Sequence, residues 1–344
     1  MPKGPEKKSK ANCRTRRRFD FVTEVVSVDE KTKQVSFILE PDPRRYEWHT
    51  LGGKKLLYDK FDKVFYDENI LRQFAEALKG CPVNYEPHTI RDAAEYVSSR
   101  RPTIESLLKG KQTPPVFSDP SEEFLRSLEA NKNEFVILSL DLIGSTKLAT
   151  TLPVEEYSRV IQTVLFEIAE VIPHFHGHIL KYTGDGIIAY FAAPSFITKN
   201  DLALDCALTL WRLVHHGLNP VFSDLGYQPI DLRIGLDSGE AAIVAIGSPT
   251  TKQHKDIIGA VVSLACKIQS VAPVGSIALG DTTVLNLHTV WRQYCREMNL
   301  PSDWNYLDSE TGKPYRVHTL HFRREFGRNP EPPLNAAPLF RPKA

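Results

Sequence analysis

From residue 134 onward, apolar patterns of strand type and of helix type follow one another in a fixed order, and this order restricts the fold more than any other feature of the sequence. Short apolar runs bounded by turn residues predict strands, and apolar residues at helical spacing predict helices. The order strand, helix, strand, strand, helix, strand is that of a ferredoxin-like α+β domain (βαββαβ), here with additions at its end. The predicted elements are a strand at 135–142, a helix at 154–172, a hairpin at 178–191, a helix at 201–216, a strand or hairpin at 230–246, a helix at 256–271 and a strand at 275–280.

The chain before residue 134 shows a different pattern. Two strands around a polar turn and two helices, near residues 69–80 and 90–100, predict a small α+β region over residues 19–115. Residues 116–133 are predicted to be a linker and a helix that starts near Ser121. No catalytic motif is recognised in the region at residues 19–115.

Both ends of the chain have biased composition. Residues 1–18 carry eight Lys or Arg and one Glu, so this arm contributes +7 to a total charge of +1, and the rest of the chain carries 1 − 7 = −6. A basic tail of this kind can touch nucleic acid or acidic lipid, but its composition favours a disordered, solvated arm, and we do not expect a nucleic acid partner. Residues 323–344 are proline-rich and are also predicted to be disordered.

The cysteines and the apolar runs indicate an intracellular protein. The five cysteines are scattered and form no CxxC pair, so neither a zinc site nor a disulfide framework is indicated. The longest clean apolar stretch, at residues 257–266, is too short to span a membrane. We therefore expect a soluble protein of the reducing cytoplasm with no membrane partner.

Two carboxylates fall at matching ends of neighbouring predicted strands. Asp141 ends the strand at 135–142 and is followed by LIGST at the start of a helix, while Asp185 lies in the bend of the hairpin. The first strand of a βαββ unit lies beside the hairpin, so both carboxylates can converge on one edge of the sheet. A lone aspartate here is usually a turn or cap residue, but a pair of them suits Mg²⁺ or Mn²⁺, which take their other ligands from water and phosphates. The free N–H groups of the helix start would accept further phosphate charge.

Four motifs in this order resemble those of one enzyme family. They are LSLDLIGSTKLA, GHILKYTGDGIIAYF, LRIGLDSGEAAIVAIG and KDIIGAVVSLACKIQ. Over residues 134–322 the sequence is similar to the class III nucleotide cyclases, the fold of the adenylate and guanylate cyclases. The resemblance implies a cyclase domain at residues 134–322.

The same resemblance implies a role for individual residues and a homodimer. In this family two groups of residues from opposite chains of a head-to-tail dimer form each active site. The implied roles are two Mn²⁺ or Mg²⁺ ions per site on Asp141, Asp185 and the carbonyl of Ile143; phosphate contacts at Gly144, Ser145 and Thr146; base recognition by Lys181 and Asp256; and catalysis by Ser263 and Lys267.

Ser263 and Lys267 depart from the family, which usually has Asn and Arg at these positions. The two residues are four apart on a predicted helix and so share a face. However, a serine side chain is shorter than that of asparagine. Lysine carries a compact ammonium group, whereas arginine carries a planar guanidinium that can donate two parallel hydrogen bonds. This departure favours the alternative of an inactive, cyclase-like module that binds nucleotides without turnover.

Lys181 and Asp256 do not by themselves choose a base. Lysine only donates hydrogen bonds and ionised aspartate only accepts them. Adenine, cytosine and uracil each offer a neighbouring acceptor and donor, so each fits this pair, and guanine fits through O6 and N1–H.

The overall resemblance is greatest to the pyrimidine cyclases of bacterial Pycsar anti-phage systems, with a compact cyclase domain behind a small N-terminal region. It implies conversion of UTP to cyclic UMP and pyrophosphate, and activation of a separate effector protein by the cyclic nucleotide. Cyclic CMP, or cyclic AMP as in ordinary adenylate cyclases, are the alternatives.

Three further features have mainly structural interpretations. The histidines of HFHGH, at residues 174–178, span a helix end and a strand start and should diverge, which argues against a zinc site. Arg233 is predicted to support the sheet through a buried ion pair. The aromatic residues of RRYEWHT, at 44–50, are predicted to pack or to lie in a surface loop.

Overall fold

The computed structural model describes residues 18–28, 35–78, 89–112, 120–128, 133–192, 198–248, 250, 253–308 and 311–321. Its main element is an eight-stranded sheet. Seven of its strands follow the order β12-β13-β11-β9-β6-β8-β7, and the eighth, β10, pairs with β9 outside this order. The strands are β6 (Asn133–Ile143), β7 (Gly177–Thr183), β8 (Gly186–Phe191), β9 (Asp231–Gly247), β10 (Gln253–Ile258), β11 (Ser276–Gly280), β12 (Cys295–Glu297) and β13 (Val317–Leu320).

The predicted ferredoxin-like α+β fold is confirmed in the centre of this sheet. β6 pairs antiparallel with both β8 and β9, and β7 pairs antiparallel with β8. The helices α4 (Ser145–Thr151) and α5 (Val154–Val171) connect β6 to β7, and α6 (Thr198–Arg212) precedes β9. The chain therefore follows the order β-α-β-β-α-β, after which β11 extends the sheet in parallel to β9.

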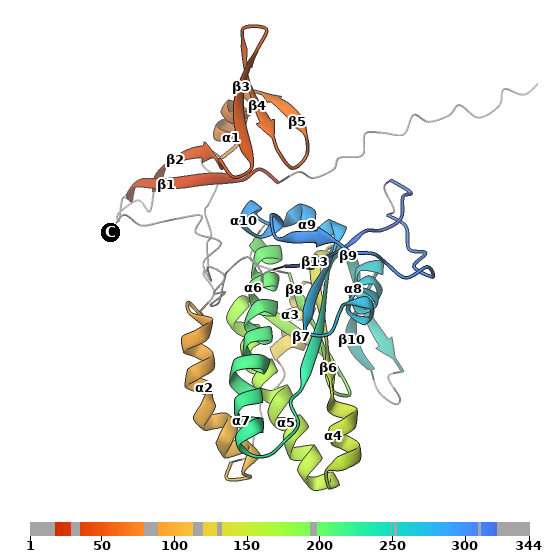
Figure 1. The fold of residues 1–344 in the computed structure, drawn as a ribbon. Helices are drawn as coiled ribbons and strands as arrows, with labels where there is room; N and C mark the ends of the chain where they lie inside the picture. Colours follow the sequence, from red (N-terminus) through yellow and green to blue (C-terminus); the bar gives the residue numbers. More distant parts are fainter. Residues whose placement is uncertain are drawn as a thin grey trace, which may run out of the picture.

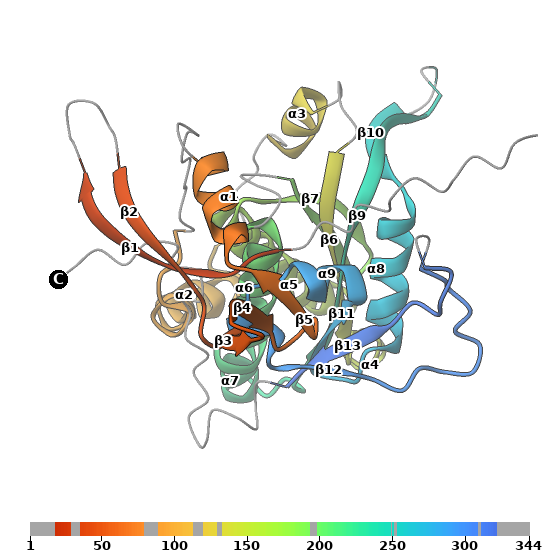
Figure 2. The ribbon, with the colours of Figure 1, turned by 90° about the horizontal axis from the view of Figure 1, so that it is seen from above.

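Helices cover both faces of the sheet because alternate residues of β6 are buried on opposite sides. Val136, Leu138 and Leu140 contribute to the larger core, which contains residues of α5 and α6. Phe135 and Ile137 belong to a second core with α8 (Ala260–Val271) and α3 (Pro120–Ser127). Figures 1 and 2 both show α5 and α6 on one side of the sheet and α8 on the other.

One helix that we grouped with the N-terminal region belongs to the larger core. In α2 (Ala93–Leu108), Val97, Ile104 and Leu108 are buried with the residues of α5 and α6. Arg100 of α2 also donates two hydrogen bonds of 2.8 Å to the buried carboxylate of Glu167 on α5. Apolar burial and this ion pair hold α2 against the cyclase-like sheet, so its sequence position does not reflect its place in the fold.

The remaining N-terminal elements form two small sheets beside one helix. The hairpin β1 (Phe21–Val28) and β2 (Val35–Pro41) was predicted, as was α1 (Asn69–Leu78). A second sheet of β3 (Tyr46–Leu51), β4 (Lys54–Asp59) and β5 (Val64–Asp67) was missed, and the residues that we expected to pack or to lie in a surface loop form β3. Figure 1 shows these elements against the end of the main sheet near α9 (Asp281–Asn286) and α10 (Thr289–Arg292).

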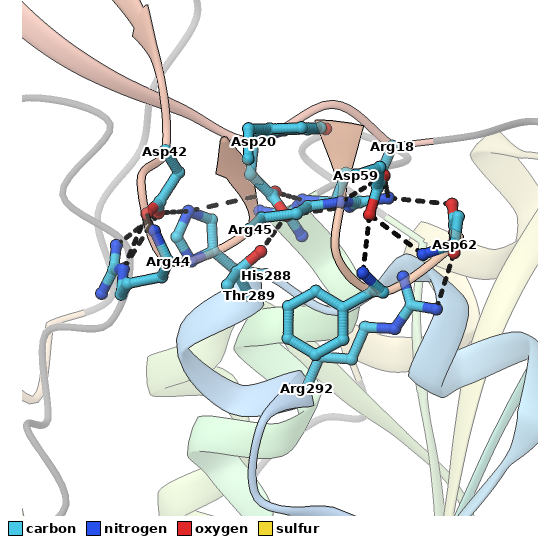
Figure 3. A network of polar contacts seen from close by, with 12 residues as sticks. Arg18, Asp20, Asp42, Arg44, Arg45, Asp59, Asp62, His288, Thr289 and Arg292 are labelled. Carbon is cyan, nitrogen blue, oxygen red and sulfur yellow. Dashed lines mark hydrogen bonds and ion pairs between the residues drawn. The ribbon is translucent and has the colours of Figure 1, made fainter. Parts of the chain in front are cut away.

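A buried network of charged side chains joins the N-terminal sheets to the main domain, and we call it the ion-pair clamp (Figure 3). At its centre, the buried guanidinium of Arg45 lies within 3.0 Å of carboxylate oxygens of Asp20, Asp59 and Asp62. Asp62 in turn accepts a hydrogen bond of 2.9 Å from Arg292 of α10. The other members are Arg18, Asp42, Arg44, Asp201, His288 and Thr289.

Arg18 corrects the predicted arm at residues 1–18. It is buried, and its Nη1 lies 2.7 Å from Asp201 of α6 and donates a hydrogen bond of 2.8 Å to the carbonyl of Asn286. Its Nε contacts Asp20 at 2.7 Å. This last residue of the predicted arm therefore belongs to the clamp, while residues 1–17 and the predicted tail at 323–344 lie outside the described residues.

The turn into α8 also differs from the prediction. We expected a helix from residue 256, but residues 253–258 form β10, and α8 begins at Ala260. β10 pairs with the part of β9 that extends beyond β6, from Ala242 to Gly247. This β9–β10 hairpin places Asp256 on a strand rather than on a helix.

Candidate active site

Asp141 and Asp185 lie at the same edge of the sheet. Asp141 is near the end of β6, and Asp185 occupies the turn between β7 and β8. Leu140 of β6 pairs with Ile187 of β8, which brings the turn beside the end of β6. A Cβ on Gly186 would lie 2.6 Å from the carbonyl oxygen of Leu140 and 3.5 Å from Oδ1 of Asp141. A side chain at position 186 would therefore separate the turn from β6.

The charge of Asp185 acts on the carboxylate of Asp141. Burial raises the pKa of Asp141, and the negative charge of Asp185 raises it further. Arg233, the register partner of Asp141 on β9, acts in the opposite direction. The negative charge of the two carboxylates is only partly offset by Arg233, and this excess of negative charge favours the binding of a divalent cation.

The donor set fits Mg²⁺ or Mn²⁺. Among the described residues, no group of three or more His, Cys, Asp or Glu side chains is arranged to hold a metal. Such ions need only one or two carboxylates when substrate phosphates and water complete their coordination. Ile143, whose carbonyl was expected to assist, is the last residue of β6, two positions beyond Asp141.

The turn after β6 holds Asp185 in place. Ser145 is buried at the start of α4, and its hydroxyl donates a hydrogen bond to Oδ2 of Asp185. Gly144 has a φ of 100°, in the left-handed region that favours glycine, and Thr146 is exposed. The sequence predicted a phosphate contact for Ser145, but did not predict that its side chain would bond to Asp185, a candidate metal ligand.

Lys181 and Asp256 form an ion pair. Nζ of Lys181 on β7 lies 2.5 Å from Oδ2 of Asp256 on β10. In the strand order, β9 and β7 are separated by β6 and β8, so the β9–β10 hairpin must reach across the sheet to bring Asp256 to Lys181. The Lys181 side chain is 40 % exposed and that of Asp256 is 6 % exposed. The lysine is therefore accessible from solvent, while the carboxylate is mostly shielded.

Ser263 and Lys267 are exposed on α8, four positions apart. α8 lies close to the main sheet because β9 has a glycine beneath it. A Cβ on Gly235 would lie 2.4 Å from the carbonyl oxygen of Ala265 and from the backbone nitrogen of Gln269. A Cβ on Gly239, the second glycine of the LRIGLDSG motif, would contact only the side chain of Val261, at 3.4 Å. The first glycine of the motif therefore sets the distance of α8 from the sheet.

The predicted site residues fall into two groups. Asp141, Asp185 and Ser145 form one, and Lys181 and Asp256 form the other. No hydrogen bond or ion pair joins these groups, or joins either one to Ser263 or Lys267, within the part of the chain that the structure describes.

Arg233 and the HFHGH histidines can be compared with their predictions. Within the described ranges Arg233 makes no ion pair, and its buried Nε has no hydrogen-bond partner, so the predicted buried ion pair is wrong. Its effect on Asp141 instead places it near the candidate metal site. The histidines diverge as expected, since His174 contacts Thr89 and His178 stacks on Phe124.

Comparison with known proteins identifies the family. The model of the family described as "Adenylate and Guanylate cyclase catalytic domain" matches residues 129–302, which is half of the chain. The chain belongs to this cyclase family. The predicted resemblance to nucleotide cyclases is thereby confirmed, and the matched residues include every candidate site residue.

Curated relatives of the chain include proteins named cytidylate cyclase. One from Escherichia coli is 24 % identical over 265 residues, covering 68 % of this chain and 56 % of the relative. One from Staphylococcus aureus is 28 % identical over 163 residues, covering 44 % of this chain and 37 % of the relative. The chain thus spans about half or less of the length of these relatives.

Solved structures similar to this chain include the guanylyl cyclase Cya2, at 26 % identity and a TM-score of 0.47. The match covers 55 % of this chain and 92 % of that one. The adenylyl cyclase CyaB from P. aeruginosa has 20 % identity and the same TM-score, and the match covers 55 % of this chain and 94 % of that one.

No helix within the described ranges has the length and apolar character needed to cross a membrane.

Proposed function

We propose that this cyclase converts a pyrimidine nucleoside triphosphate into the 3′,5′-cyclic monophosphate and pyrophosphate, with UTP as the preferred substrate. The observation that carries the proposal is the meeting of Asp141 and Asp185 at one sheet edge, where the negative charge of Asp185 raises the pKa of Asp141. A domain without catalytic function has no physical need for two converging carboxylates. The names of the curated relatives support a pyrimidine as the base.

Asp141, Asp185 and the carbonyl of Ile143 would hold two Mg²⁺ or Mn²⁺ ions. When bound, these ions supply positive charge that activates the ribose 3′-hydroxyl and stabilises the leaving pyrophosphate. Ser145 keeps the Asp185 carboxylate oriented toward this edge through its hydrogen bond. The backbone of Gly144, Ser145 and Thr146 would contact the β- and γ-phosphates.

The reaction forms a bond between O3′ and the α-phosphorus and breaks the bond between the α-phosphorus and the bridging oxygen to the β-phosphate. The hydroxyl proton passes to solvent, and pyrophosphate leaves with the electron pair of the broken bond. Lys267 would place a positive charge beside the α-phosphate as negative charge develops on it, and Ser263 would orient the ribose. Lys181 and Asp256 would bind the base.

The proposal requires a homodimer. The two groups of site residues are not joined by contacts within one chain, and a head-to-tail dimer would bring the metal group of one chain to the base-reading group of the other. The exposure of Lys181, Ser263 and Lys267 in the single chain is compatible with such an interface.

Two other functions have specific support. Cyclic CMP formation from CTP is favoured by the relatives' printed names. A nucleotide-binding module without turnover is favoured by Ser263 and Lys267, which stand where the family usually has Asn and Arg. Cyclic AMP formation, which is also compatible with Lys181 and Asp256, has no support from these names.

We also propose that the cyclic nucleotide is a second messenger that activates a separate effector protein in anti-phage defence, in the cytoplasm. This part of the proposal rests on the resemblance to the Pycsar pyrimidine cyclases.

Product analysis tests the proposed function. The purified full chain is incubated with ATP, GTP, CTP and UTP together in the presence of Mn²⁺, and the products are separated and identified by mass. Cyclic UMP as the dominant product supports the proposal in full. Dominant cyclic CMP corrects the base, and dominant cyclic AMP contradicts the pyrimidine assignment. The absence of any cyclic product from a dimeric, metal-bound protein favours the binding module.

A further inference from the structure

A histidine lies next to the Lys181–Asp256 ion pair, in a position that no motif assigned. His254 is on β10, two residues before Asp256, so both side chains project from the same face of that strand. Nε2 of His254 lies 3.8 Å from Oδ2 of Asp256, the same oxygen that Lys181 contacts at 2.5 Å. Asp256 is therefore the shared neighbour of the lysine and the histidine.

All three side chains retain hydrogen-bonding capacity. The distance of 3.8 Å is too long for a hydrogen bond, and His254 has no other partner among the described residues. Its side chain is 48 % exposed. Lys181 carries three donor hydrogens, of which the contact with Asp256 uses one. Asp256 accepts a bond of 2.8 Å from the backbone nitrogen of Ile257 at Oδ1, and its oxygens have lone pairs left for a ligand.

We propose that His254 is a third base-reading residue and that the ordered set Lys181, Asp256, His254 selects uracil. The inference rests on the proposed function, because it assumes that Lys181 and Asp256 contact the base. Lys181 donates, Asp256 accepts, and His254 donates through Nε2–H in the corresponding tautomer. The Watson–Crick edge of uracil presents O4, N3–H and O2, which is acceptor, donor, acceptor. The two patterns are complementary at all three positions.

No other common base matches this set. Cytosine presents donor, acceptor, acceptor in this order, so its amine would meet the donor Lys181 and its N3 would meet the acceptor Asp256. In the reversed orientation N3 and the amine fit Lys181 and Asp256, but a C–H group then faces His254. Adenine presents donor, acceptor and a C–H group in the same order. In the reversed orientation its N1 and amine fit Lys181 and Asp256, but its Watson–Crick edge then ends at the amine and leaves His254 without a partner on that edge. Guanine presents O6 and N1–H to the first two residues, but its 2-amino group would then meet a second donor at His254. A site built for a hydrogen-bonding group disfavours a ligand that leaves the site's polar groups unpaired.

The test compares substrates in variants of the full chain. His254→Leu removes the donor, and His254→Gln retains a donor of shorter reach. Gln253→Leu is the matched control, because Gln253 is exposed on the adjacent position of β10 and projects from the opposite face. The ratio of kcat/KM for UTP to that for ATP is measured for each protein.

His254→Leu is expected to lower kcat/KM for UTP about 3- to 10-fold, the effect of one net hydrogen bond, and to leave the value for ATP unchanged. His254→Gln should recover part of the loss, and Gln253→Leu should behave as wild type. An equal loss for UTP and ATP, or no loss for either, overturns the inference. A wild-type preference for CTP over UTP also overturns it.

A binding measurement separates this inference from the proposed function. The affinities of wild type and His254→Leu for a non-hydrolysable UTP analogue and the matching ATP analogue are measured by calorimetry with Mn²⁺. If wild type forms no cyclic product but His254→Leu weakens only the UTP analogue, the proposed cyclase function fails and the base-reading role stands. If wild type forms cyclic UMP and His254→Leu changes neither binding nor turnover, the cyclase function stands and the role of His254 fails.

Discussion

The hydroxyl of Tyr315 donates a hydrogen bond of 2.6 Å to Oδ1 of Asp237, a carboxylate that is buried in the middle of β9. A Cβ on Gly280 would lie 2.1 Å from that same oxygen, so only glycine leaves room for the carboxylate. Burial raises the pKa of Asp237 to about 7, and nearby Asp281 also raises it, while the bonds from Tyr315 and from the backbone of Ser238 lower it. The carboxylate therefore changes its protonation near neutral pH.

Asp237 should make the stability of the fold depend on pH. Between about pH 4 and pH 7 the folded chain keeps a proton on Asp237 that the unfolded chain has released, so the contribution to stability is complete below pH 4 and is lost as the pH rises to 7. The free energy of unfolding should fall by up to about 1.4 kcal/mol per pH unit from this group and level off above pH 7.

Urea unfolding of wild type and Asp237→Asn across this range checks the prediction. The asparagine variant should lack this decline, so its stability relative to wild type should increase with pH. Tyr315→Phe should extend the decline to higher pH, because it removes a bond that lowers the pKa of Asp237. Parallel curves for Asp237→Asn and wild type would contradict the assignment.

Asp141→Ala and Asp185→Ala should each lower turnover by at least about 100-fold, by analogy with the loss of a single charge-stabilising group in an active site. Dimers should persist, since each variant removes one carboxylate from the proposed site and none of the apolar packing of the fold. The measurements are cyclic nucleotide formation, Mn²⁺-dependent thermal stabilisation and size-exclusion chromatography. Undiminished turnover in either variant would refute the metal assignment.

Gly235→Ala should lower both stability and activity, because the new methyl group would overlap the backbone of α8 and displace the helix that carries Ser263 and Lys267. Overpacking of this kind costs about 1–3 kcal/mol. Gly239→Ala is the matched control on the same face of β9, where the methyl group would make ordinary contact with Val261. Thermal unfolding and product formation should change in the first variant and stay close to wild type in the second. Equal effects would show that the spacing of α8 does not depend on Gly235.

Arg45→Met should lower the free energy of unfolding by about 3–5 kcal/mol, since it leaves the buried carboxylates of Asp20 and Asp59 without their common partner. Arg101→Met is the control: Arg101 pairs with Asp224 on the surface, with both side chains exposed, and its loss should cost less than about 1 kcal/mol. Urea unfolding followed by circular dichroism measures both. A loss for Arg45→Met as small as that of the control would mean that the clamp does not hold the N-terminal sheets.

The central fold and much of the candidate site were predictable because they depend on local patterns. The strand at β6 and the hairpin of β7 and β8 have clear apolar runs, and the βαββ order alone implies that Asp141 and Asp185 meet. β3 to β5 were missed because polar and charged residues interrupt their apolar residues, as in the exposed Lys54 and Lys55 of β4. Within these three strands only Tyr46, Leu57 and Asp59 are buried, so no continuous apolar face marks them in the sequence.

The contacts that depend on distant segments were not predictable. Nothing in the sequence around Arg18 distinguishes it from the other basic residues of the arm, since its partners Asp201 and Asn286 lie 183 and 268 positions away. His254 could have been noticed as the residue two positions before Asp256, but only if that segment had been predicted as a strand. The apolar run that follows Asp256 favoured a helix, and the predicted helix included Gly259. In the structure Gly259 is the residue before α8.

The ion-pair clamp has a consequence for how the protein is made. Arg18 and Asp20 contact Asn286 and Thr289, which are 268 and 269 positions later in the chain. At translation rates of about 5–20 residues per second, the early half of the clamp leaves the ribosome roughly 10 to 50 s before the late half is synthesised. During that interval its charges remain in water, and the N-terminal sheets have no surface on which to dock. Attachment of the N-terminal sheets is therefore one of the last events in the biogenesis of this protein, after the central sheet has been translated.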